Sequence, residues 1–125
     1  MSSQSAEHDV PSDRGQARSA IANAIVRLHA EHYGRGPTRA RATITDDFVL
    51  VLLEDVFTTA ERTLIGAGRG EHVIAMRDAF NETMRDTFVD IVEQSTGRRV
   101  RAFVCQTHLD PELAAELFLL EPEAA

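Results

Sequence analysis

The sequence predicts an α+β fold, with a small four-stranded, mostly antiparallel sheet and about three helices packed on one face of it. Two hydrophobic periods lead to this prediction. Apolar residues recur every three or four positions in residues 16–32 and 70–95, as in a helix, and every second position in residues 39–45 and 99–107, as in a strand. Short links between the strands favour antiparallel pairing. The expected element order is α-β-β-α-α-β-β.

The first helix is expected over residues 16–32 and should end near Gly34. Glycine suits the left-handed position that follows a helix, and Pro37 cannot continue one. Residues 1–14 are rich in Ser, Asp, Glu and Pro and have little to bury, so we expect a disordered tail there. Residues 15–122 then form a single domain. The helix presents one apolar stripe, made of Ala17, Ala20, Ile21, Ala24, Ile25 and Leu28.

A β-hairpin is expected over residues 39–56. Residues 39–45 alternate between apolar and polar, as a strand with one exposed face does. Asp46 and Asp47 form a polar break typical of a tight turn. Residues 48–53 are a continuous apolar run, which indicates a central strand or a strand with one face in a subunit contact.

Two helices should follow the hairpin. Thr58 and Glu61 match a capping box, in which the hydroxyl accepts from a backbone N–H and the carboxylate reaches back. This short helix should stop at Gly66 or Gly68. A longer helix is expected from there to about Ser95, ended by Gly97. Its apolar seam comprises Val73, Met76, Phe80, Met84, Phe88, Ile91 and Val92.

Two more strands complete the sheet. Residues 99–107 alternate, and residues 116–121 can form a fourth, short strand. The segment Asp110-Pro111-Glu112 between them is typical of a turn or of a helix start.

Composition limits the function classes. The net charge is −7, and all 13 basic residues are Arg, so nucleic acid is not expected as a partner. The absence of Lys excludes Schiff-base chemistry. One cysteine, Cys105, cannot form an intramolecular disulfide. Because the chain has neither an export signal nor an apolar run long enough to span a membrane, we expect a cytoplasmic protein without a transmembrane segment.

The Arg-Gly turns are the candidate binding site for an anion or a partner. Glycine lets backbone N–H groups approach a ligand, and an Arg fork binds carboxylate or phosphate. One turn spans residues 34–37, and the other, residues 66–70, precedes a helix, where anions are favoured. The alternative is that the turns only end helices and the arginines pair with the chain's own carboxylates. The candidate residues are Arg35, Gly36, Arg39, Arg41 and Arg69.

Other constellations do not indicate chemistry. His29 and His32 lie three apart on a helix but have no third ligand at a recognisable spacing. Asp46 and Asp47 are explained by turn chemistry, and Cys105 by a buried, inert thiol. We therefore expect no metal, no cofactor and no enzymatic activity.

Several strings resemble the MpsC-like family in an ordered succession. They are residues 33–41, 46–54, 58–64, 68–70 and 96–103, with Arg77, Phe80 and Met84 between them. The resemblance covers about residues 16–122. The family name implies association with a membrane-potential-generating, sodium-translocating system whose membrane parts resemble a bicarbonate or CO₂ uptake complex. It implies a soluble, non-catalytic accessory or regulatory protein, and the family has no catalytic residues to carry over.

Two alternatives stay open at this point. The chain could be a sensor that binds a small anion or a nucleotide at the Arg-Gly turns, or, against its negative charge, an RNA-binding module. In the accessory hypothesis a homodimer is expected. The apolar run of residues 48–53 and the Met/Phe seam of residues 73–91 are first of all core, and part of either could be the dimer surface, because so small a domain has limited room to cover an apolar strand twice.

Overall fold

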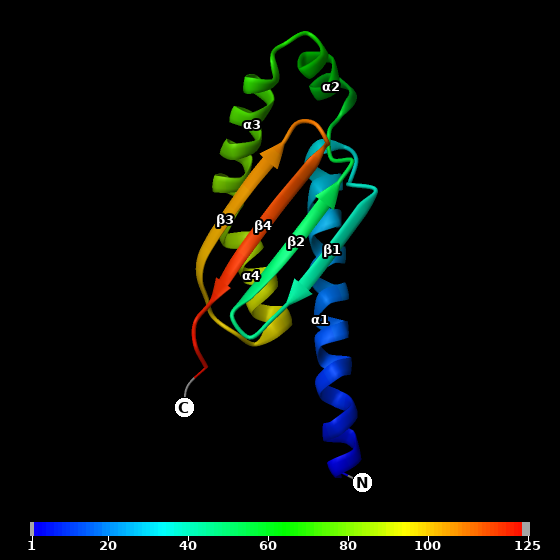
Figure 1. Ribbon diagram of the computed structural model, residues 1–125, viewed down its shortest axis with the longest axis vertical. Coiled ribbons are helices and arrows are strands. Elements are labelled where there is room, and N and C mark those ends of the chain that lie inside the picture. Colours follow the sequence, from blue (N-terminus) through cyan, green and yellow to red (C-terminus); the bar gives the residue numbers. More distant parts are fainter. Residues whose placement is uncertain (1, 124–125) are drawn as a thin grey trace.

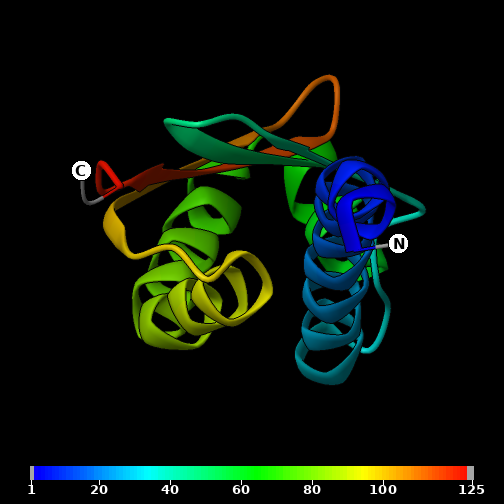
Figure 2. The same ribbon diagram turned by 90° about the horizontal axis from the view of Figure 1, so that it is seen from below.

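The computed structural model describes residues 2–123 and the side chains of residues 13–123. Its four strands form one antiparallel sheet in the order β1-β2-β4-β3, and all helices lie on one side of that sheet (Figures 1 and 2). The predicted α+β class and the antiparallel sheet are confirmed, with one more helix than expected. The elements are α1 (Ser2–Tyr33), β1 (Arg39–Ile44), β2 (Phe48–Glu54), α2 (Thr59–Gly66), α3 (Gly70–Thr83), α4 (Arg85–Thr96), β3 (Val100–His108) and β4 (Leu113–Leu120).

Helix α1 ends as predicted and begins earlier than predicted. Gly34 follows it at φ 81, and its amide donates to the Ala30 carbonyl at 3.0 Å. Among the α1 side chains that the structure describes, from residue 13 on, Ala17 is the first buried one, so the predicted apolar period coincides with the packed part of the helix. The side chains of the predicted tail, residues 1–14, lie almost wholly outside the described range, and that tail stays a prediction.

The predicted long helix over residues 70–95 is wrong in one respect: it is two helices, α3 and α4. Met84 separates them with φ −92 and ψ 5, and α4 ends at Gly97 with φ 70, as expected. The break turns α4 so that the Phe88 ring packs 6.0 Å from the Phe103 ring on β3. Since no Gly or Pro marks residue 84, tertiary packing and not local propensity sets this break.

The sheet has an inner face toward the helices and an outer face away from them. Opposite residues of paired strands share a face, so Val51 on β2 lies beside Ala42 and Glu116 on the inner face. Leu50 and Leu117 pair on the outer face. The inner positions of β2 and β4 are buried and the outer ones half-buried.

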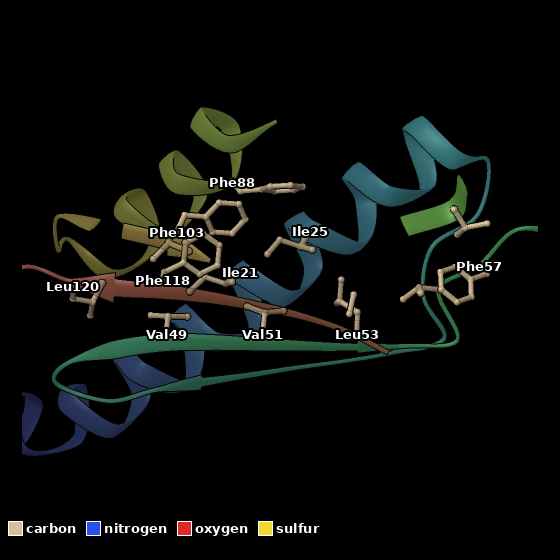
Figure 3. Close-up of a cluster of buried hydrophobic side chains, with 14 residues drawn as sticks. Ile21, Ile25, Val49, Val51, Leu53, Phe57, Phe88, Phe103, Phe118 and Leu120 are labelled. Carbon is tan, nitrogen blue, oxygen red and sulfur yellow. The ribbon is translucent and has the colours of Figure 1, made fainter. Parts of the chain in front are cut away.

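The core lies between the inner face and helices α1, α3 and α4. Figure 3 shows apolar side chains of α1 and of the strands meeting Phe88 from α4. Each side chain of this size stabilises the fold by about 1.5–3 kcal/mol when fully buried. The fully enclosed members are Ile21, Ile25, Val49, Val51, Leu53, Phe57, Phe88, Val92 and Phe118.

Candidate functional site

Arg35 faces the protein and not a free site. Its guanidinium donates to the backbone carbonyls of Asp55 at 2.9 Å and Phe57 at 2.6 Å, and to the Asp55 carboxylate at 3.1 Å. It thereby joins the turn after α1 to the turn after β2. The neighbouring Gly36 presses on α1, because a Cβ there would lie 3.1 Å from both the Cγ1 atom and the carbonyl of Val26. Arg35 and Gly36 therefore keep the turn after α1 close to the turn after β2 and to α1 itself.

Asp55 is the acceptor around which this crossing is built. It has φ 57, a left-handed conformation in which Asp is tolerated better than most residues. Its carboxylate accepts from Arg35 and from Arg62 of α2. The Thr38 hydroxyl and then these guanidinium groups lower the pKa of Asp55. Arg62 also donates to Glu112 at 2.8 Å, which ties α2 to the turn before β4.

Arg39 and Arg41 lie on the outer face of β1, as the alternation predicted. Their guanidinium groups are 3.6 Å and 4.0 Å from the Glu54 carboxylate, and both side chains are exposed. Such exposed pairs contribute about 0–1 kcal/mol each. Their charges are therefore available to a partner at small cost.

Arg69 stands apart from the other predicted arginines. It precedes α3, is exposed, and its amide donates to the Leu64 carbonyl at 2.8 Å. Gly70 beside it is pressed against Leu109 of the β3–β4 turn, since a Cβ would lie 2.5 Å from a Leu109 methyl carbon. The structure thus gathers Arg35, Arg39 and Arg41 around the carboxylates of Glu54, the last residue of β2, and Asp55, which follows it. It places Arg69 by the β3–β4 hairpin.

Two hollows of the described surface lie away from these arginines. A cavity of about 430 Å³ lies between α1, α4 and the sheet, lined by Arg14, Thr45 and Arg98 among others. Another of about 450 Å³ lies over Asn81 and Cys105. None of the predicted arginines lines either cavity. The anion-sensor alternative stays a prediction.

Sequence reasoning missed a buried ion pair. Arg77 on α3 and Glu61 on α2, each 3 % exposed, form a two-pronged pair with N–O distances of 2.7 and 2.5 Å. Arg77 also donates to the Val56 carbonyl and stacks on the Tyr33 ring, 3.7 Å from its centroid. Burial alone would raise the pKa of Glu61, but the hydrogen bonds from Arg77 and from the Thr58 backbone hold it below its ordinary value.

The helical spacing in the sequence contained a signal for the buried position of Arg77. Arg77 lies four residues after Val73 and four before Asn81, and all three are buried on one face of α3. The apolar seam instead included Met76, which is 45 % exposed. Glu61 was expected only as the capping carboxylate, a role that the structure confirms.

Glu116 is another buried ionisable group. It lies on the inner face of β4, is 1 % exposed, and its Oε1 atom has no hydrogen-bond partner among the described residues. Burial raises its pKa to about 8. The hydroxyl of Tyr33 is likewise buried without a partner there, and burial raises the pKa of Tyr33 to about 12.

The helices leave the outer face of the sheet open. Figure 2 shows them all beneath the sheet. At the edge of this face Val104 of β3 is 57 % exposed. Its central strands present Phe48, Leu50, Leu52, Leu113, Ala115, Leu117 and Leu119.

These features define a class: a small antiparallel α+β domain with helices on one face of its sheet and an open apolar surface on the other. The chain belongs to the family described as Na⁺-translocating membrane potential-generating system (MpsC), whose model matches residues 13–122. It is also 28 % identical over 91 residues to "Uncharacterized protein YbcI" of Bacillus subtilis, which covers 72 % of this chain and 73 % of that protein. No solved structure matches the chain.

Two further findings concern the described part of the chain. Among residues 2–123, none of the helices is long and apolar enough to cross a membrane. In the same range, no group of three or more His, Cys, Asp or Glu side chains is placed to hold a metal ion.

Proposed function

We propose that this chain is a non-catalytic accessory protein of the Na⁺-translocating, membrane-potential-generating system for which its family is named. The family match over residues 13–122 carries the proposal, because it spans nearly the whole chain. The finer parts of the proposal are a cytoplasmic location, service to ion or bicarbonate transport, and a homodimeric state.

The contacts of the arginines support a docking role over a catalytic one. Arg35 is committed to three internal acceptors, so it is assigned to holding the fold. Arg39, Arg41 and Arg69 are exposed and carry positive charge on a chain of net charge −7. They are the side chains assigned to an acidic segment of a partner subunit, which local opposite charge attracts and orients.

The test is co-purification with the membrane subunits, together with Na⁺-dependent bicarbonate uptake in cells with and without this protein. We expect the membrane subunits to co-purify and uptake to fall when the protein is absent. The variant Arg69→Gln should weaken co-purification several-fold, and Arg27→Gln, an exposed arginine on α1, is the matched control. If the membrane subunits do not co-purify with the protein and its deletion leaves uptake unchanged, the accessory role is wrong.

A further inference from the structure

The outer face has the composition of a protein interface. Its two central strands present seven apolar side chains in adjacent rows, and Leu50 and Leu117 are direct neighbours at the centre. The polar outer residues lie around this apolar centre, with Arg39 and Arg41 on β1, Glu54 at the end of β2 and Gln106 on β3. An apolar centre inside a polar rim is the usual anatomy of an interface core.

The dimensions of this face favour a flat binding partner over a single helix. Four strands spaced about 4.8 Å apart span about 19 Å, and seven residues of about 3.4 Å span about 24 Å. A single helix is about 10–12 Å wide with its side chains, so it would leave one of the two leucine rows uncovered. A second sheet face, packed about 10 Å away, covers both rows at once.

The charge of the outer face is compatible with a second copy of this chain as the binding partner. The Arg, Asp and Glu residues at the paired outer-face positions are Arg39, Arg41 and Glu54, which gives these positions a formal charge of +1 from two Arg and one Glu. The chain as a whole has a net charge of −7. Two copies that meet on their outer faces therefore keep their surplus carboxylates away from the contact, where like charges would be costly.

The area suits a dimer of moderate affinity. In flat projection the face measures about 450 Å² per copy, or about 900 Å² for two copies. The relief of leucine-sized side chains raises the accessible area above this projection, toward the roughly 1,200 Å² at which stable interfaces begin.

We propose that the outer face of the sheet is covered by the outer face of a second copy of this chain. The dimer is a sheet-on-sheet sandwich with Leu50 and Leu117 of each copy at its centre. This inference supplies the surface for the homodimer in the proposed function and rests on that part of it, whereas co-purification with membrane subunits is a separate measurement.

Sedimentation equilibrium of the full chain tests the proposal. The wild type should reach twice the 13.8 kDa of one chain at micromolar concentration. Leu117→Glu should raise the dimer dissociation constant at least tenfold, because it brings two buried carboxylates together at the centre. Leu64→Glu, an exposed leucine on α2, is the matched control and should leave the dimer intact.

A mixing experiment separates loss of the interface from loss of the fold. Leu117→Glu and Leu117→Arg should each be monomeric with the circular dichroism of the wild type, and should form a heterodimer when mixed. A wild type that stays monomeric at about 100 μM, two orders above a micromolar dissociation constant, overturns the proposal. A dimer that Leu117→Glu leaves unchanged overturns this surface and not the accessory role.

Discussion

The two faces of one sheet differ in an instructive way. The inner face is sealed by helices, yet it holds the ionisable Glu116, and the Arg77–Glu61 pair is buried beside it. The outer face is uncovered by any described helix, yet its central strands are apolar. An antiparallel sheet with one face in water usually carries polar residues on that face, so the apolar central strands of the outer face depart from the usual pattern. The inner side therefore combines apolar packing with internal electrostatics, whereas the outer face is apolar at its centre and, in the proposed dimer, is covered by a second copy.

The largest effect should come from breaking the buried ion pair. Arg77→Ala leaves Glu61 buried without its partner, and such a loss costs about 3–5 kcal/mol. Urea unfolding measures the change in the free energy of unfolding. Arg69→Ala, at the exposed start of the same helix, should change it by less than about 0.5 kcal/mol. Equal losses in the two variants would show that the pair does not hold the inner side together.

Adjacent leucines on β2 compare the two faces directly. Leu53 is fully enclosed on the inner face, so Leu53→Ala should cost about 2–5 kcal/mol. Leu52, next along the strand, is half-buried on the outer face, and Leu52→Ala should cost less than about 1 kcal/mol at low protein concentration. Its cost should grow with concentration as the dimer forms. A concentration-independent loss equal to that of Leu53→Ala would mean that the outer face is already covered within one chain.

The third effect is a pH dependence that belongs to the inner face. The pKa of Glu116 is about 8 in the folded chain, above its ordinary value. Between about pH 5 and 8 the unfolded chain loses this proton while the folded chain keeps it, so the free energy of unfolding falls by up to about 1.4 kcal/mol per pH unit. Below that window the contribution of Glu116 to stability is fully present.

Glu116→Gln should remove this slope and leave the variant more stable than the wild type at pH 8. Glu71→Gln, on the exposed side of α3, should keep the wild-type slope. Thermal unfolding in a pH series measures both. Parallel curves for Glu116→Gln and the wild type would mean that this carboxyl ionises freely in the folded chain.

The smallest effect concerns the unpartnered hydroxyl on the inner side. Tyr33→Phe removes a buried polar atom that has no partner among the described residues, so stability should stay level or rise by less than about 1 kcal/mol. The ring that carries the Arg77 stack is kept. Differential scanning calorimetry detects the shift, and a loss above 1 kcal/mol would reveal a partner for this hydroxyl.

The features of the fold that the sequence predicts correctly are those that local signals determine. Gly34 and Gly97 end their helices in the left-handed conformation, and Thr58 with Glu61 forms the capping box. These features depend on neighbours within a few residues. The break at Met84 depends instead on packing between α4 and the strand beneath it, which a helical period does not encode.

The contacts of the candidate site residues are harder to predict from the sequence, because they also depend on residues that are distant in the chain. The sequence shows that Arg35, Arg39 and Arg69 are present, but not that Asp55, 20 residues from Arg35, occupies its guanidinium. Arg77 finds Glu61 at a separation of 16 residues. Which arginine is structural and which is exposed is decided by such distant pairings.

The position of β4 has a consequence for how the protein is made. β4 comes last of the four strands in the chain, yet it lies between β2 and β3 in the sheet. A ribosome must add residues 55–112 after β2 before that neighbour exists, which takes about 3–12 s at about 5–20 residues per second. During this interval the apolar β2 lacks its central neighbour and presents a free edge, so nascent chains of this protein should be clients of ribosome-associated chaperones.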